Sequence, residues 1–169
     1  MRQDLQYYLR LWRARFSRRR KLLWRDGRLQ NGYCRDCLYC CGPQDNPKPF
    51  PLALLPHQMR PDLADDFFLL AEGMPYIGAE GCKSCGSRGC RLPLEKRPVA
   101  CDLFPLVLAN GLLYMYKTCP AVLFTPLAEL VDIGNTAAGW IAGLSHADLR
   151  HIFLDLPAQA LAERYIFLA

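Results

Sequence analysis

Nine cysteines in a chain of 169 residues are the residues whose type and spacing could do chemistry. Four of them lie within eight positions, separated by spacers of two, two and no residues: Cys34, Cys37, Cys40 and Cys41. Two-residue spacers let successive thiolates surround one metal centre, as in zinc knuckles and iron–sulfur proteins. This run therefore predicts a metal site with sulfur ligands.

The remaining cysteines follow along the chain and extend the set of candidate ligands. They are Cys82, Cys85, Cys90, Cys101 and Cys119. Glycines at positions 81, 86 and 89 surround the first three of these, and glycine permits the tight turns that aim several sulfurs at one point. All nine cysteines are therefore candidate metal ligands.

The choice of metal depends on the type and number of ligands. Thiolates favour zinc and iron–sulfur clusters over magnesium, calcium or manganese. A tetrahedral zinc and a [4Fe–4S] cluster each take four sulfurs, so nine cysteines indicate two centres, or one centre with further redox-active thiols. Adjacent Cys40 and Cys41 should point apart and therefore belong to different centres. Cys119-Pro120 resembles the Cys-Pro ending of ferredoxin-type runs, so we expect Cys119 to join the triplet Cys34, Cys37 and Cys40 around an iron–sulfur cluster, with zinc as the alternative.

Two explanations without metal also apply to a cysteine-rich chain. Free cysteines behave as small hydrophobic residues, but a packed apolar face does not require four of them in eight positions. A disulfide framework suits secreted proteins. The number of cysteines here is odd, and the arginine-rich stretch from Arg10 to Arg20 lacks the apolar segment of a secretory signal. We therefore expect a cytoplasmic protein with reduced thiols.

Residues 34–41 resemble the C-x-x-C-x-x-C-C signature of the YkgJ-type cysteine-cluster family, whose members are described as zinc- or iron-chelating domains. The later motifs of that family follow here in the same order: Gly89-Cys90, then Arg97-Pro98 with Cys101 and Phe104-Pro105, then Cys119-Pro120. Asp102 stands where the family usually has arginine, and either Cys82 or Cys85 matches the cysteine that precedes Gly-Cys. The resemblance spans about half of the chain.

The resemblance implies a metal-binding protein and leaves open whether the chain is an enzyme. The best-described relatives resemble flagellin lysine N-methylase, which implies S-adenosylmethionine and an iron–sulfur cluster. One alternative function is therefore a protein methyltransferase or oxidoreductase of that type. No glycine-rich nucleotide loop supports methyl transfer, because Gly134, Gly139 and Gly143 lie in a segment expected to be helical. The other alternative is a zinc-stapled module that binds nucleic acid or protein.

Positive charge is concentrated at the N-terminus. Residues 1–28 contain ten Lys or Arg and two Asp, a net charge of +8, whereas the whole chain has a net charge of +5. Apolar side chains recur there at helical spacing, at Leu5, Tyr8, Leu9, Trp12, Phe16 and Leu23. This pattern predicts a basic amphipathic helix over 4–25, with its apolar stripe packed on the C-terminal helices. Its arginines would be free for an acidic protein partner, and nucleic acid is the alternative partner.

The fold expected from the whole sequence is mainly α with a small β-hairpin and irregular cysteine-rich metal-binding loops. One compact domain would contain the basic helix (1–28) and a cysteine-cluster domain with C-terminal helices (29–169). Loops occupy 33–103 apart from a short helix over 61–72, and Asn110-Gly111 predicts a hairpin over 106–116. Helices are expected over 126–133, 136–144, 146–153 and 157–167, with Thr136 and Ser145 as N-caps. No apolar run reaches the ~20 residues of a membrane span.

Overall fold

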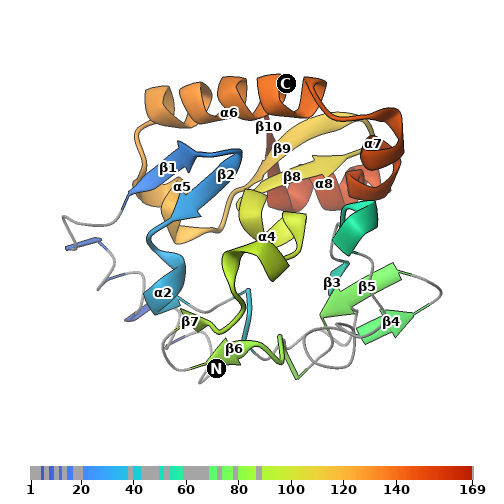
Figure 1. Cartoon of the computed structure of the whole chain (residues 1–169). Helices are drawn as coiled ribbons and strands as arrows, with labels where there is room; N and C mark the ends of the chain where they lie inside the picture. The colour runs from blue at the N-terminus through green and yellow to red at the C-terminus, as the bar shows by residue number, and fades with distance from the viewer. Residues whose placement is uncertain are drawn as a thin grey trace.

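The computed structural model describes residues 5, 8–9, 12, 15–16, 21–37, 40–42, 50–51, 54–58, 69–71, 74–77, 80–86 and 89–168. Within these ranges, ten short strands form four antiparallel sheets, and helices pack around them (Figure 1). No described helix is long and apolar enough to cross a membrane.

The sheet of the C-terminal half has the strand order β10-β9-β8 (Figure 1). β8 (Leu106–Ala109) and β9 (Leu112–Tyr116) form a hairpin, and β10 (Tyr165–Phe167) pairs with the other side of β9. Asn110 and Gly111 make the turn with φ angles of 51° and 79°, which asparagine and glycine tolerate better than other residues. The hairpin predicted from the Asn-Gly pair is confirmed.

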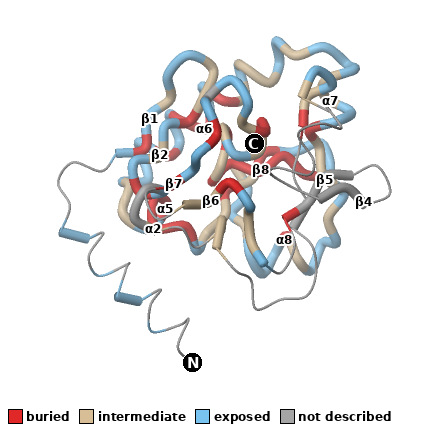
Figure 2. The backbone as a smooth tube through the Cα atoms, turned by 60° about the horizontal axis from the view of Figure 1, so that its bottom comes forward, coloured by how far each residue is buried: buried red, intermediate tan, exposed pale blue. Residues whose placement is uncertain are grey.

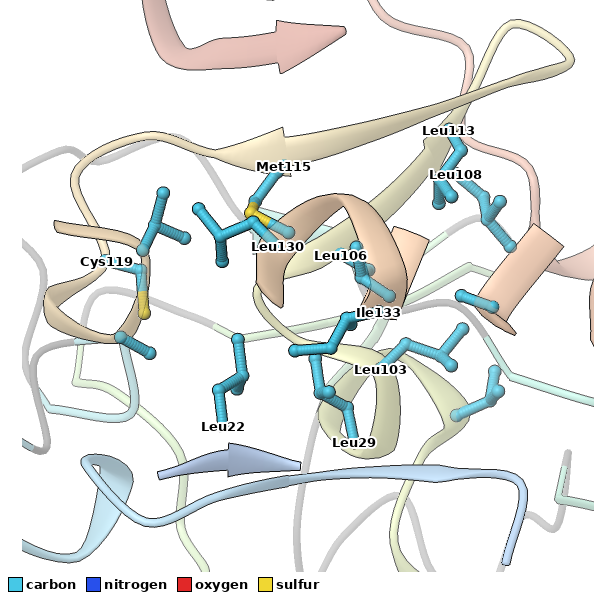
Figure 3. Close-up of a cluster of buried hydrophobic side chains, with 14 of the residues drawn as sticks. Leu22, Leu29, Leu103, Leu106, Leu108, Leu113, Met115, Cys119, Leu130 and Ile133 are labelled. Atoms are coloured by element: carbon cyan, nitrogen blue, oxygen red, sulfur yellow. The ribbon is translucent and has the colours of Figure 1, made fainter. Parts of the chain in front are cut away.

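The longest helix, α6 (Leu127–Ala142), covers one face of this sheet and buries the main core (Figure 1). Leu130, Ile133 and Ala137 follow one another at helical spacing and are all buried. They belong to one cluster with Leu106 and Met115 of the sheet, and Figure 3 shows the labelled side chains of this cluster gathered between α6 and the strands. Apolar burial therefore determines how α6 sits on the sheet.

A second hairpin encloses the same core. β1 (Leu22–Arg25) pairs with β2 (Arg28–Asn31), and both turn residues, Asp26-Gly27, have positive φ angles of 54° and 71°. Leu22 and Leu29 extend from this hairpin into the core cluster (Figure 3). The predicted helix over 4–25 is therefore wrong for residues 22–25. The Asp26-Gly27 pair forms a two-residue hairpin turn, which the helical periodicity of the preceding residues does not indicate.

The apolar stripe of the N-terminal segment is exposed. Leu5, Leu9, Trp12 and Phe16 expose 49% to 67% of their surface, and the predicted packing of this stripe on the C-terminal helices is wrong. Figure 2 shows the buried residues concentrated on the later elements, whereas the described residues from 5 to 16 are all exposed. The helical periodicity itself is matched where the structure describes it, since residues 5, 8, 9, 12 and 15 are helical.

The C-terminal helices agree with the sequence in part. α6 runs without a break through Thr136, whose hydroxyl donates to the carbonyl of Asp132 at 2.8 Å instead of capping a new helix. Ser145 caps α7 (His146–Ile152) as predicted, since its hydroxyl accepts from the N–H of Asp148 at 3.1 Å. The remaining helices of this half are α5 (Pro120–Phe124) and α8 (Ala158–Arg164). Residues 165–167, predicted to be helical, form β10.

Short elements make up the chain between β2 and β8. They are α2 (Cys34–Cys37), β3 (Phe50–Pro51), the 3₁₀ helix η1 (Pro56–Gln58), β4 (Leu69–Ala71), β5 (Met74–Ile77), β6 (Cys85–Gly86), β7 (Gly89–Cys90), the 3₁₀ helix η2 (Leu94–Lys96) and α4 (Val99–Leu103). The predicted helix over 61–72 is wrong for residues 69–71, which form β4 in a sheet of order β3-β5-β4. Residues 61–68 and 72 lie outside the described residues.

The predicted fold class, mainly α with one small hairpin, is wrong. The described residues combine helices with strands in four antiparallel sheets. Apart from β9, the strands have only two to four residues, which is too short to show the alternation of apolar and polar positions from which a strand is predicted. Their pairing depends on tight turns and on neighbouring elements instead.

Candidate metal centre

The first cysteines are positioned by α2, which begins at Cys34 and ends at Cys37. The N–H of Cys37 donates to the carbonyl of Tyr33 at 3.0 Å, and the buried Tyr33 ring stacks on Phe124 of α5 with centroids 6.3 Å apart. α5 begins directly after Cys119, its N-cap residue. Aromatic packing therefore ties α2 to the helix that Cys119 precedes.

Cys119 is the one buried cysteine of the nine, all of which the structure describes. Its sulfur accepts a hydrogen bond from the side-chain amide of Asn31 at 3.8 Å. The N–H groups at the start of α5 also point toward this sulfur and lower its pKa, although burial has the larger effect and raises the pKa to about 11. Polar donors thus already surround the Cys119 sulfur.

A second set of cysteines is held together by backbone hydrogen bonds. The N–H of Cys82 donates to the carbonyl of Cys41 at 2.8 Å, and the N–H of Cys85 donates to the carbonyl of Cys82 at 2.9 Å. Cys85 and Cys90 are directly paired across the β6–β7 ladder. Figure 1 shows α2, β6 and β7 at the end of the molecule opposite α6. Cysteines about fifty residues apart in the chain therefore lie together at this end.

Gly81 is required for this approach. It has a φ of 86°, and a Cβ at this position would lie 2.6 Å from the carbonyl carbon and oxygen of Gly42. Backbone atoms cannot move aside as a flexible side chain can, so only glycine fits here. The glycine predicted to permit a tight metal loop does bring the segment of Cys82 against the segment of Cys41.

The electrostatics of the thiols show which sulfurs are neighbours. Burial raises the pKa of Cys40 well above its usual range, and the nearby sulfurs of Cys119 and Cys41 raise it further. The pKa of Cys34 is raised by the same causes, burial first and Cys119 next. Cys37 contributes to the rise at each of these thiols. We call Cys34, Cys37, Cys40 and Cys119 the first sulfur group.

The thiols of Cys41 and Cys101 lie near a different set of cysteines. Burial raises the pKa of Cys41 to about 12, and repulsion from Cys82, Cys85 and Cys90 follows. Burial also raises the pKa of Cys101 well above its usual range, with Cys41, Cys82 and Cys90 next. Cys101 keeps exposed surface, yet protein surrounds its sulfur closely enough for burial to dominate. We call Cys41, Cys82, Cys85, Cys90 and Cys101 the second sulfur group.

The two sulfur groups adjoin at Cys41, which also raises the pKa of Cys34 and Cys40. No disulfide joins any of the nine cysteines. In the part of the chain that the structure describes, no three His, Cys, Asp or Glu side chains converge as a metal-ion site. The structure thus brings the predicted ligands into two neighbouring groups of thiols without showing a ligated metal geometry.

Two polar residues beside the sulfur groups, Ser84 and Asn31, were not singled out as functional by their sequence positions. Ser84 lies between Cys82 and Cys85 and is 1% exposed, and its hydroxyl has no hydrogen-bond partner. Asn31 precedes the cysteine run and donates to Cys119, as described above. Neither position carries a spacing signal, because a single serine or asparagine in a loop is common. Only the fold places them among the sulfurs.

Asp102 pairs with Arg28 across the junction of α4 and β2, with the Arg28 Nε 3.6 Å from the Asp102 Oδ2. Burial raises the pKa of this carboxyl group, and the positive charges of Arg28 and Arg97 oppose the rise. The sequence marked this position only because the resembling family has arginine there. In this chain Asp102 forms an ion pair with Arg28 of β2.

Comparison of the chain with family models, with curated proteins and with solved structures finds no match.

Proposed function

We propose that this chain is a metal-binding protein that uses its two sulfur groups as ligands, with an iron–sulfur cluster as the preferred cofactor and zinc as the alternative. The observation that carries the proposal is that cysteines from separate segments, none of them in a disulfide, lie in two adjoining groups. The likeness of residues 34–120 to the YkgJ-type family supports the same function. Free thiols also suit a reducing compartment, so we propose a cytoplasmic location.

The donor set fits such a cofactor chemically. Sulfur is the donor that zinc and iron–sulfur clusters select, and hard cations such as magnesium do not. Thiols whose pKa is raised by burial and by neighbouring sulfurs are neutral at pH 7, so a bound cation would release their protons and compensate the repulsion between thiolates. A bound iron–sulfur cluster would supply electron transfer, whereas zinc would supply structural stability.

Anaerobic purification followed by iron, zinc and acid-labile sulfide determination tests this proposal. We expect more metal than a single tetrahedral zinc, because nine soft ligands exceed one site, and we expect sulfide to accompany iron. Colourless, sulfide-free protein with one zinc per chain would remove the iron–sulfur preference. Protein that takes up neither metal under reducing conditions would remove the proposed function altogether.

An enzymatic role, as a protein methyltransferase or oxidoreductase of the flagellin N-methylase type, is the alternative that the resemblance brings. It requires S-adenosylmethionine or a redox substrate to bind beside the sulfur groups. Calorimetric titration of the metal-loaded protein with S-adenosylmethionine distinguishes it. Saturable binding would favour the methyltransferase, and its absence would leave metal binding as the proposed function.

A second role, binding an acidic protein partner, is favoured by the exposed N-terminal segment. Its described apolar side chains are exposed, and Trp12 and Phe16 contact each other with ring centroids 5.3 Å apart. Residues 1–20 contain seven Arg and one Asp, a net charge of +6. Exposed apolar side chains within a positively charged segment are suited to a partner with an acidic, partly apolar face.

Titration with an acidic helical peptide and with a nucleic-acid duplex, each with and without residues 1–20, tests this second role. We expect the full chain to bind the acidic peptide and the truncated chain to lose that binding. Binding to the duplex whose affinity falls linearly with the logarithm of salt concentration, lost on the same truncation, would identify nucleic acid as the partner instead.

A further inference from the structure

Ser84 occupies a fixed place in the turn that carries the second sulfur group. Its carbonyl accepts from the N–H of Arg91 at 2.9 Å, and the Arg91 guanidinium donates to the carbonyl of Lys83 at 2.5 Å. The N–H of Cys85 closes the turn onto Cys82 at 2.9 Å. The backbone on both sides of Ser84 is therefore held, and the residue lies buried in the turn between Cys82 and Cys85.

The Ser84 hydroxyl is an unusual group to bury in such a turn. It is the single buried side-chain oxygen or nitrogen without a hydrogen-bond partner in the residues that the structure describes. The residue is 1% exposed, so water does not reach it freely. A buried hydroxyl without a partner destabilises the fold, and native proteins retain one mainly where a ligand, ion or water completes the site.

We propose that the Ser84 hydroxyl donates a hydrogen bond to a metal-bound sulfur of the second sulfur group. This inference rests on the proposed function and deepens it, because it assigns a positioning residue that supplies no bond to the metal. A hydroxyl can donate one hydrogen bond, and the cysteines two positions before and one position after Ser84 bring sulfur acceptors to the same turn.

The expected effect of this hydrogen bond follows from the charge on the sulfur. A metal-bound thiolate is an anionic acceptor, so a donor stabilises it and lowers the electron density that it gives to the metal. For an iron–sulfur cluster such donors raise the reduction potential, and for zinc they stabilise the bound state.

The test compares full-length Ser84→Ala and Ser84→Thr with the unaltered chain, all loaded with metal anaerobically. Competition with a chelator measures metal retention, and redox titration measures the potential where iron is present. We expect Ser84→Ala to weaken retention by about 10- to 100-fold, the usual effect of removing a group that orients a metal ligand, and to lower the potential. Ser84→Thr, which restores a hydroxyl, should recover most of both.

Stability measurements separate this role from simple packing. Removing an unpartnered buried hydroxyl should leave the metal-free chain at least as stable as before, whereas Ser145→Ala, which removes a helix cap far from the sulfurs, should lower stability and leave metal retention unchanged. Equal metal retention and equal potential in Ser84→Ala and the unaltered chain would overturn the inference while leaving the proposed function intact. An unaltered chain that binds no metal would overturn both.

Discussion

The two ends of this molecule differ in what can stabilise them. The end under α6 is packed with apolar side chains, among them Leu22, Met115 and Ile152, which expose 2% or less of their surface. Among the described residues from 33 to 98, the buried hydrophobic residues are Tyr33, Leu54, Ile77 and Leu92. Hydrophobic burial is therefore sufficient to explain the stability of the end under α6. The described residues of the cysteine end bury few hydrophobic side chains.

The cysteine end contains closely spaced thiols, whereas the end under α6 contains an apolar core. Free thiols are small, so they bury less apolar surface than leucine or methionine and contribute less to stability. We therefore expect the folded structure of the cysteine end to depend on what its sulfurs bind. Each of the following predictions tests that difference between the two ends.

Metal removal should have the largest effect, and it should be confined to one end. Structural metal sites contribute on the order of 10 kcal/mol of apparent binding free energy to the folded state. After chelation we expect amide hydrogen exchange to accelerate over the described residues from 80 to 98, with β8, β9 and α6 still protected. Equal loss of protection at both ends would show that they unfold as one unit.

Replacing either of the adjacent residues Cys40 and Cys41 should distinguish the metal site of one sulfur group from that of the other. Cys40→Ser should remove the metal of the first sulfur group, and Cys41→Ser should remove that of the second, because Cys41 is joined by backbone to Cys82. Each variant should retain roughly half of the bound metal. Metal analysis and absorption spectra of the paired variants measure this. Complete loss in both variants would indicate one shared centre instead of two.

A substitution in the apolar core should destabilise the end under α6 and leave metal binding at the cysteine end unchanged. Met115 is 1% exposed, so Met115→Ala should lower the free energy of unfolding by about 2–5 kcal/mol through lost burial and a cavity. Leu112→Ala on the same strand is the matched control, since Leu112 is 42% exposed and its truncation should cost far less. Denaturant titration measures both. Metal content should be unchanged in each, and loss of metal in Met115→Ala would mean that the ends are coupled.

The parts of the fold that could be predicted from sequence are those governed by local rules. Asn110-Gly111 gave the β8–β9 hairpin, and Ser145 gave the start of α7, because turn and cap preferences act within a few residues. Asp26-Gly27 carried the same kind of signal as Asn110-Gly111 and was misinterpreted. The helical periodicity upstream of it continued into Leu23, which made a helix end appear the simpler interpretation.

The parts that could not be predicted depend on contacts between distant segments. The burial of the N-terminal stripe was inferred from its periodicity, yet Trp12 is 62% exposed, because periodicity shows that a face is apolar and not what covers it. The cysteine spacing identified the candidate ligands, and the assignment of Cys40 and Cys41 to different centres stays a prediction. The division of the later cysteines, and the place of Ser84 among them, depended on the fold.

The smallest expected effect concerns the ion pair between Arg28 and Asp102, which joins the core hairpin to the helix that carries Cys101. Arg28 is 38% exposed and Asp102 is 13% exposed, so solvent screens one partner and protein partly encloses the other. A double-mutant cycle with Arg28→Ala and Asp102→Asn should give a coupling of about 0.2–1 kcal/mol, which is typical of such pairs.

The two single variants should not be equivalent. Arg28→Ala leaves a carboxylate whose burial is no longer compensated by that positive charge, whereas Asp102→Asn removes the charge that burial disfavours. We therefore expect Arg28→Ala to be the more destabilising of the two in urea titration at pH 7. The exchange variant Arg28→Asp with Asp102→Arg should regain part of the loss, since it keeps opposite charges at the junction. Metal content should stay constant throughout this series. A fall in metal content with Asp102→Asn would show that this carboxylate serves the sulfur groups and not only the contact between the two ends.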